Sequence, residues 1–227
     1  MKKIVIAIDG HAGCGKSTTA RLVAKKLNYI FIDSGAMYRA VTLYLLQKNI
    51  SLNNHSAVID SLEKINLSFE KNPVSKKNEI LLNNENVESK IRSMDINNNV
   101  SEVSSIKEVR SFLVKQQHEM GKKKGIIMDG RDIGTVVFPD AELKIFMTAS
   151  IEARAKRRIE ELKNKGESFL EEEIYTNLRE RDYKDSTRKE SPLRKAADAI
   201  TIDTSQLTIE EQVDKVIALV DRQLEKL

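Results

Sequence analysis

The chain has 227 residues, of which 40% are hydrophobic and 32% charged, a composition typical of a globular protein and not of a disordered chain. Its 38 Lys and Arg residues exceed its 34 Asp and Glu residues, an excess compatible with an anionic ligand but too small to indicate bulk nucleic-acid binding. The single cysteine, Cys14, excludes an internal disulfide. No apolar run exceeds the length of a strand, and Asp9 interrupts the first run too early for a secretory signal. We therefore expect a cytoplasmic protein.

Short apolar runs alternate with helical patterns along the chain. Five runs are apolar at consecutive positions, as in strands that are buried on both faces of a parallel sheet. These runs are 3–9, 29–33, 125–129, 143–148 and 199–202. The helical patterns between them predict βαβ units and a doubly wound α/β fold around a five-stranded parallel sheet. The last helix is predicted to begin at the capping box Thr208-x-x-Glu211.

Two stretches depart from this alternation. Residues 60–100 are rich in Asn and Lys, with strand-like pieces at 65–70 and 79–82 and a turn candidate at Asn83-Asn84, which predicts a small β-rich insertion. Residues 150–190 read as two charged helices interrupted near Gly166, the second capped by Ser168 with Glu171, Glu172 and Glu173 in its first turn. Because this segment has little apolar surface to bury, a mobile flap is expected.

A glycine-rich segment directly follows the first predicted strand: Gly10-His11-Ala12-Gly13-Cys14-Gly15-Lys16-Ser17-Thr18. It matches G-x-x-x-x-G-K-[ST] and precedes a helical pattern at 18–27. Glycines let the backbone fold around a phosphate with its N–H groups inward, and the helix N-terminus adds its positive end. Lys16 can reach the β- and γ-phosphates, and the Ser17 hydroxyl can ligate Mg²⁺. This segment, the phosphate loop, predicts binding of a nucleoside triphosphate; a glycine-rich turn with a surface lysine is the structural alternative.

Charged residues follow the second and third predicted strands. The two segments are Asp33-Ser34-Gly35-Ala36-Met37-Tyr38-Arg39 and Asp129-Gly130-Arg131-Asp132-Ile133-Gly134. Acids at the carboxyl ends of strands can orient Mg²⁺-bound water, and arginine can clamp a phosphate bidentately. A surface ion pair is the alternative for each residue alone. Two such clusters at one sheet edge favour a second anion site, and the sequence lacks the N-K-x-D segment of a switch GTPase.

Arginines recur on the charged helices. Arg154, Arg157 and Arg158 share one helical face, and Arg181, Asp185 and Arg188 share another. Like charges at this spacing repel, which favours an anion arriving between the flap and the phosphate loop; a solvated helix with Glu161 paired to Arg157 is the alternative. The histidines His11, His55 and His118 are isolated from one another, so we expect a structural role for His11 and no histidine metal site.

Together these segments resemble the bacterial cytidylate kinases, of the nucleoside monophosphate kinase class, over nearly the whole chain. The resemblance rests on the phosphate loop, on 33–39, on the distinctive segment 129–141, on Arg181-Asp182 with Asp185 and Arg188, and on Ser191-Pro192-Leu193 followed by Ala197-Asp198-Ala199. The insertion at 60–100 resembles the extended nucleotide-binding part of the bacterial enzymes. His11-Ala12 stands where many relatives have Pro-Ser, and Cys14 where alanine is usual, which leaves open a small change in ATP affinity.

The resemblance implies transfer of the γ-phosphoryl group of ATP to CMP or dCMP with Mg²⁺. It implies that the acceptor is bound by Ser34, Arg39, Ser101, Arg110, Asp132, Arg181, Asp185 and Arg188. Of these, Ser101, Arg110, Asp132 and Arg188 match the cytosine-reading set, and Arg181 and Asp185 match contacts to the ribose. We expect charge on the transferred group to be neutralised by Lys16, Arg131, Arg157 and Arg181. A phosphate oxygen is already ionised near pH 7, so no strong general base is expected.

The resemblance also implies a division of one P-loop kinase domain. Its core would comprise 1–35, 104–149 and 191–227, its monophosphate-binding part 36–103, and its lid 150–190. Such a lid would close over bound nucleotides and exclude water. The expected partners are ATP, CMP and dCMP, with no nucleic acid or membrane and with the protein a monomer.

Two other functions remain open at this point. A kinase for another monophosphate, or for a small acceptor such as shikimate, would share the phosphate loop and the core. A nucleotide-dependent RNA-binding switch could also use a phosphate loop and a basic helix, although the chain lacks aromatic stacking platforms and a basic stripe.

Overall fold

The computed structural model describes residues 2–74 and 78–227, with the Lys165 side chain left out. Contacts divide the chain into two compact units, Met1–Phe31 with Lys124–Leu227, and Ile32–Lys123. The sequence-based division placed 32–35 and 104–123 in the core, whereas both stretches fall in the second unit. Residues 104–123 group with the second unit since α5 (Lys107–Gly121) packs against α2 (Ser34–Gln47) and α3 (His55–Leu62).

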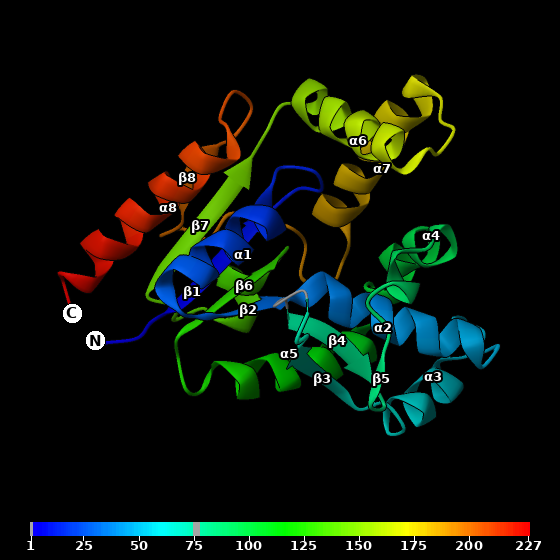
Figure 1. The fold of residues 1–227 in the computed structure, drawn as a ribbon. Helices are drawn as coiled ribbons and strands as arrows, with labels where there is room; N and C mark the ends of the chain where they lie inside the picture. Colours follow the sequence, from blue (N-terminus) through cyan, green and yellow to red (C-terminus); the bar gives the residue numbers. More distant parts are fainter. Residues whose placement is uncertain (1, 75–77) are drawn as a thin grey trace. The chain divides into compact units, whose positions relative to one another are not determined.

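A mostly parallel five-stranded sheet organises the first unit, with the strand order β2-β6-β1-β7-β8 (Figure 1). The strands are β1 (Val5–Gly10), β2 (Ile30–Asp33), which runs on into the second unit, β6 (Ile126–Gly130), β7 (Leu143–Thr148) and β8 (Ile200–Asp203). All the residues of β1 and of β6 are buried, as continuous apolar runs predict for strands covered on both faces. The predicted α/β fold around a five-stranded sheet is confirmed.

Two helices of the first unit, α1 (Lys16–Leu27) and α8 (Ile209–Leu224), pack against each other and against the sheet (Figure 1). Their apolar faces join the strands in one core, to which Val23 of α1, Ile6 of β1 and Val216 of α8 contribute fully buried side chains. Removal of this apolar surface from water is the main stabilising contribution to the unit. The predicted capping box of α8 is confirmed: Thr208 Oγ1 accepts from the Glu211 N–H at 3.2 Å, and a Glu211 carboxylate oxygen accepts from the Thr208 N–H at 2.8 Å.

The charged helices α6 (Ile151–Lys165) and α7 (Glu171–Thr187) pack side by side beyond the carboxyl end of β7 (Figure 1). They share a small apolar cluster of buried residues: Ala155, Leu162, Ile174 and Leu178. The segment thus buries a few apolar side chains between its two helices, in keeping with the expectation of little apolar surface. Whether the segment is mobile remains a prediction.

The boundaries of these two helices test the predicted caps. Gly166, with φ +68°, ends α6 in the left-handed conformation that glycine adopts without strain, as predicted. Ser168 does not cap α7; the helix begins later, at Glu171, and Leu170 before it provides no side-chain cap. Phe169 packs against the α6–α7 apolar cluster, which accounts for the extended backbone before the helix. The glutamates of the first turn still favour the positive end of the helix.

The second unit combines helices with a three-stranded antiparallel sheet, β3-β4-β5. Besides α2, α3 and α5 it contains β3 (Leu67–Lys71), β4 (Asn78–Leu82), β5 (Glu85–Asn86), the short 3₁₀ helix η1 (Lys90–Arg92) and α4 (Met94–Val103). Asn83 and Asn84 both have positive φ, as a tight two-residue hairpin turn requires. The β-rich insertion is thus confirmed, except for residues 75–77, which lie outside the described residues. No described helix is both long and apolar enough to cross a membrane.

Candidate active site

The phosphate loop directs its carbonyl groups toward donors of the first unit. These donors are Lys16 Nζ to His11 (2.6 Å), Arg154 to Ala12 (3.4 Å), Arg157 to Gly13 (3.2 Å) and Thr204 Oγ1 to Cys14 (2.9 Å). In a planar trans peptide the N–H group points away from the preceding carbonyl. Each N–H group of residues 12–15 therefore points away from the donor that binds the carbonyl before it. N–H groups of a glycine-rich loop at a helix N-terminus are suited to bind phosphate.

At two positions of the phosphate loop, Gly10 and Gly15, neighbouring atoms leave no room for a side chain. A Cβ atom on Gly10, which has φ +148°, would lie 2.0 Å from the Met147 carbonyl oxygen. A Cβ atom on Gly15, with φ +89°, would lie 2.7 Å from Oε1 of the buried Gln212. Any larger residue would push the loop away from β7 or α8. The glycines of the sequence pattern thus allow the backbone to approach its neighbours closely.

Lys16 is the buried cation of the phosphate loop, with 6% of its surface exposed. Its Nζ atom lies 3.7 Å from the Cys14 sulfur in addition to its bond to His11. Burial lowers the pKa of Lys16, while the carboxylates of Asp129 and Asp9 oppose that shift. An anionic ligand in the loop would favour the charged ammonium in the same way. The placement fits the predicted role of Lys16 at the β- and γ-phosphates.

Ser17 and Asp129 form the candidate metal site. The Ser17 hydroxyl donates to Asp129 Oδ2 at 2.6 Å. Asp129 lies near the carboxyl end of β6, where it is in register with Ile8 of β1. Mg²⁺ takes oxygen ligands and is usually bound by one or two carboxylates, retained waters and substrate phosphates, so a hydroxyl and a carboxylate beside a phosphate loop fit this ion. The sequence prediction assigned Ser17 alone to the metal, although the acid at a strand end next to β1 was a usable signal.

Asp9, at the end of β1, holds the segment that follows β6. Its two carboxylate oxygens accept from the N–H groups of Ile133 (2.8 Å) and Gly134 (2.7 Å). These N–H groups belong to the π-helical turn η2 (Ile133–Val137), which begins after the buried Asp132. Burial raises the pKa of Asp9 to about 6, and the two backbone hydrogen bonds oppose the rise. Asp9 thereby fixes the backbone beside Asp132.

Arg131 and Asp185 form an ion pair within the first unit. The Arg131 Nε atom lies 2.7 Å from Asp185 Oδ2, and both side chains are largely buried. Burial opposes ionisation of Asp185, but Arg131, Arg181 and Arg188 outweigh it and lower the pKa of this carboxyl. Arg188 also donates to the Ser191 carbonyl at 2.7 Å and 2.9 Å. The structure thus brings three predicted site residues, Arg131, Arg181 and Arg188, around the carboxylate of a fourth, Asp185 of α7.

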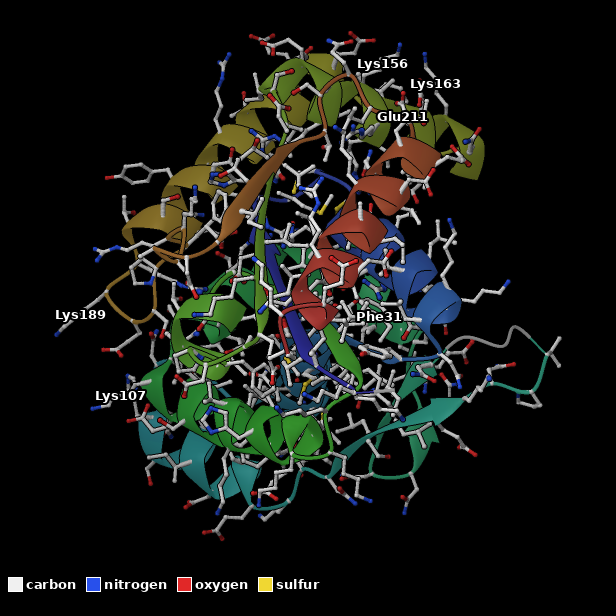
Figure 2. The ribbon with its side chains drawn as sticks, turned by 90° about the vertical axis from the view of Figure 1, so that its left-hand side faces the viewer. Phe31, Lys107, Lys156, Lys163, Lys189 and Glu211 are labelled. Atoms are coloured by element: carbon white, nitrogen blue, oxygen red, sulfur yellow. The ribbon has the colours of Figure 1, made fainter. Side chains whose placement is uncertain are left out.

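The arginines of α6 have partners other than those the sequence suggested. Arg154 is buried and pairs with Asp182 at 2.7 Å, and Arg157 donates to the Thr204 carbonyl at 2.5 Å. The pair of Glu161 with Arg157, offered as the alternative, is not found among the described side chains, because Glu161 pairs with Arg158 at 2.8 Å. Loop carbonyls and Asp182 therefore offset the like charges without an incoming anion. The opposite face of α6, marked by Lys156 and Lys163 in Figure 2, is exposed.

Two further predicted acceptor residues, Ser34 and Arg39, lie in the second unit near the start of α2. Asp33 caps this helix by accepting from the Ala36 N–H at 2.9 Å and pairs with Arg92 at 3.0 Å. Burial opposes its ionisation, but Arg92 and Arg39 outweigh burial and lower its pKa. Ser34 is buried next to it. The structure therefore groups Ser34 and Arg39 with two further charged side chains of the same unit.

Arg110 and Ser101 lie farther along the second unit. Arg110, on α5, is 4% exposed and donates to the Ser104 carbonyl at 3.1 Å. Its guanidinium carbon lies 5.5 Å from the centre of the Tyr38 ring. Ser101 belongs to the last turn of α4, where its carbonyl accepts from the Ser104 hydroxyl. Ser104 thus connects the two predicted base-reading residues of this unit.

A family model described as cytidylate kinase matches residues 6–222. The chain belongs to the cytidylate kinase family. It is 54% identical to the cytidylate kinase of Bacteroides fragilis over 96% of each chain. It is 52% identical to that of Cytophaga hutchinsonii over 96% of this chain and 93% of the relative. A gluconokinase from Sinorhizobium meliloti has a similar fold, with a TM-score of 0.52 at 14% identity over 99% of this chain and 95% of its own.

Some residues of the candidate site were not identified from the sequence. Thr204, which is fully buried, donates to the Cys14 carbonyl from the loop after β8. Gln212 accepts from the Thr19 hydroxyl at 2.9 Å and donates to the Leu207 carbonyl at 3.1 Å. Gln212 immediately precedes an apolar position of α8, and this polar residue at the edge of a buried face was the available signal. Nothing in the local sequence marks Thr204.

Proposed function

We propose that the protein transfers the γ-phosphoryl group of ATP to CMP or dCMP, giving ADP with CDP or dCDP. The observation that carries this proposal is the family match over residues 6–222, with relatives more than half identical along nearly the whole chain. The phosphate loop supports it, because protein donors bind four of its carbonyls and the N–H groups that follow them point away from those donors.

At the donor end, the loop N–H groups and Lys16 bind the phosphates of ATP. Ser17 and Asp129 would hold Mg²⁺, since their oxygens lie 2.6 Å apart at the start of α1. The ion, when bound, neutralises charge between the β- and γ-phosphates. Lys16 moves from the His11 carbonyl to a phosphate oxygen, and so exchanges a neutral acceptor for a charged one.

At the acceptor end, hydrogen bonds read the base. Cytosine presents an amino donor at N4 beside acceptors at N3 and O2. The Asp132 carboxylate can accept from N4, and Arg110 can donate to N3 or O2. Uracil would place O4 against the carboxylate and an N3–H against the guanidinium, so the same pair attracts cytosine and repels uracil.

The other predicted acceptor residues keep the roles that the resemblance implies. Ser101 and Arg188 complete the contacts to the base, while Arg181 and Asp185 bind the ribose. Ser34 and Arg39 bind near the acceptor nucleotide, and the pair of Asp33 with Arg92 holds the start of their helix in place.

Catalysis needs positioning and neutralisation of charge more than a general base, because the attacking phosphate oxygen is already ionised near pH 7. Arg131 and Arg181 neutralise charge on the transferred group. Arg157 acts with them through the phosphate loop, since its guanidinium supports the Gly13 carbonyl. Helices α6 and α7 act as a lid that excludes water, which would otherwise accept the phosphoryl group.

The protein is proposed to work as a cytoplasmic monomer on free nucleotides, with no nucleic acid or membrane as partner.

A coupled assay of ADP release tests the proposed activity. The acceptors compared are CMP, dCMP, UMP, AMP, GMP and shikimate, each with ATP and Mg²⁺. We expect CMP and dCMP to give the highest kcat/KM by a wide margin. A preference for AMP, GMP or shikimate would contradict the proposal that a cytidine monophosphate is the acceptor. ADP release with none of them, together with salt-sensitive RNA binding, would favour an RNA-binding switch.

A further inference from the structure

Asp182 of α7 connects this helix to the phosphate loop. Its Oδ1 atom accepts from Nη1 of Arg154 at 3.0 Å, and its Oδ2 atom forms an ion pair with Nη2 of Arg154 at 2.7 Å. Its Oδ1 atom also lies 3.1 Å from Nδ1 of His11. Burial opposes ionisation of Asp182, but the contacts from His11 and Arg154 outweigh it and lower its pKa to about 2. The side chain therefore stays a carboxylate at neutral pH.

The two partners of Asp182 connect it to two consecutive residues of the phosphate loop, His11 and Ala12. His11 is itself a loop residue, and its Nδ1 atom is buried with no well-directed hydrogen bond to any described residue, so the Asp182 carboxylate is the charged group beside it. Arg154 donates to the carbonyl of the next residue, Ala12. A shift of the Asp182 carboxylate would therefore change the positions of both His11 and Ala12.

One turn farther along α7, Asp185 pairs with Arg131. Residues three apart on a helix are neighbours on its surface. Asp182 and Asp185 thus place two adjacent carboxylates of one helix against two different parts of the unit: the phosphate loop after β1 and Arg131 after β6. Arg181, proposed to contact the acceptor, directly precedes Asp182 in sequence.

We propose that Asp182 is a positioning residue that couples the two substrates, so that a donor nucleotide in the phosphate loop and a cytidine nucleotide each tighten the binding of the other. This inference rests on the proposed function, because it needs both nucleotides to bind. A triphosphate fixes the loop, the loop fixes Asp182 through His11 and Arg154, and α7 then holds Asp185 and Arg181 in place. By linkage the acceptor strengthens donor binding by the same factor.

The test measures this coupling directly by calorimetry. The Kd of a non-hydrolysable ATP analogue with Mg²⁺ is measured with and without saturating CMP, and the Kd of CMP with and without the analogue. We expect CMP to tighten the analogue about 10-fold in the unaltered protein, within the usual range of such couplings, and the reverse measurement to give the same factor. Asp182→Asn should reduce the factor to less than about 2-fold.

Two further variants complete the design. Glu180→Gln removes the same charge from an exposed position of the same helix and should keep the full coupling. His11→Ala removes the contact from the loop side and should weaken the coupling with α7 unaltered, which keeps the test decisive if Asp182→Asn unfolds. Kinetically, Asp182→Asn should raise the KM of each nucleotide at saturation of the other.

The outcomes separate the two proposals. Full coupling in both Asp182→Asn and His11→Ala, or no coupling in the unaltered protein, would overturn this inference while CMP phosphorylation stands. Failure of the unaltered protein to bind CMP or to form CDP would overturn the proposed function itself.

Discussion

The hydroxyl of Ser17 donates to the carboxylate of Asp129 at 2.6 Å, although the two residues are 112 positions apart in the chain. The sheet explains the contact, because β1 and β6 are parallel neighbours whose carboxyl ends meet at one edge. The loop after β1 therefore lies beside the last residues of β6. One side chain from each supplies an oxygen ligand suited to Mg²⁺.

Substitution of Asp129 should change the requirement for Mg²⁺. Asp129→Asn keeps the size of the side chain but removes its charge, which weakens attraction for a divalent cation. We expect the Mg²⁺ concentration for half-maximal activity to rise at least ~10-fold, in rate measurements at fixed ATP. Asp140→Asn, at an exposed position after η2, is the control and should leave this concentration unchanged. An unaltered Mg²⁺ requirement in Asp129→Asn would exclude it as a metal ligand.

Lys16 should be needed for turnover and dispensable for folding. Lys16→Met removes the cation that acts on the β- and γ-phosphates, and we expect kcat to fall at least ~100-fold. Because Lys16 is buried with a lowered pKa, the substitution should not lower the thermal unfolding temperature by much. Lys26→Met, at an exposed surface pair with Asp214, is the matched control. Near-normal turnover of a folded Lys16→Met protein would refute the assigned role.

Asp132 should determine the choice between cytosine and uracil. Asp132→Ala removes the group that accepts from cytosine N4 and repels uracil O4. CMP activity should therefore fall disproportionately, and the ratio of kcat/KM for CMP to that for UMP should narrow at least ~10-fold. Both values are measured in the ADP-release assay, with Asp140→Ala as control. If Asp132→Ala keeps the original ratio, another residue reads the base.

Asp9 should make stability depend on pH in the acidic range. Its pKa is raised from 3.8 to about 6 in the folded protein, so the folded state binds more protons than the unfolded state between these values. The contribution of Asp9 to stability is therefore greatest below about pH 4 and declines as the pH rises through about 6, by up to roughly 3 kcal/mol. Urea unfolding of the unaltered protein and of Asp9→Asn should reveal this decline in their difference. If the difference in unfolding free energy between the two proteins is constant or grows with pH, the pKa of Asp9 is not raised in the folded protein.

The sequence predicted the elements that depend on local pattern. Continuous apolar runs located the five strands of the sheet because a strand covered on both faces needs no polar positions. The glycine spacing located the phosphate loop, since close backbone approach at Gly10 and Gly15 tolerates no side chain. Thr208 and Glu211 located the start of α8 because both partners of a capping box lie in one turn.

The sequence did not predict contacts that depend on tertiary structure. From the sequence, Arg154 and Arg157 were predicted to form a cationic face that binds an anion. In the structure they donate to loop carbonyls more than 140 residues earlier in the chain. Thr204 supports the same loop from the far end of the chain. The cap expected at Ser168 is wrong, because α7 begins only at Glu171. Phe169, which has no part in the capping pattern, packs against the α6–α7 apolar cluster before the helix begins.

The reaction itself can be followed by ³¹P nuclear magnetic resonance in a mixture of protein, ATP, CMP and Mg²⁺. Our account predicts that the β-phosphate signal of ATP is lost while two doublets of CDP grow together with those of ADP, in equal amounts and with little orthophosphate. Lys16→Met should give almost no change over the same time. Growth of orthophosphate with ADP and without CDP would show that water accepts the phosphoryl group, and would contradict transfer to a cytidine nucleotide.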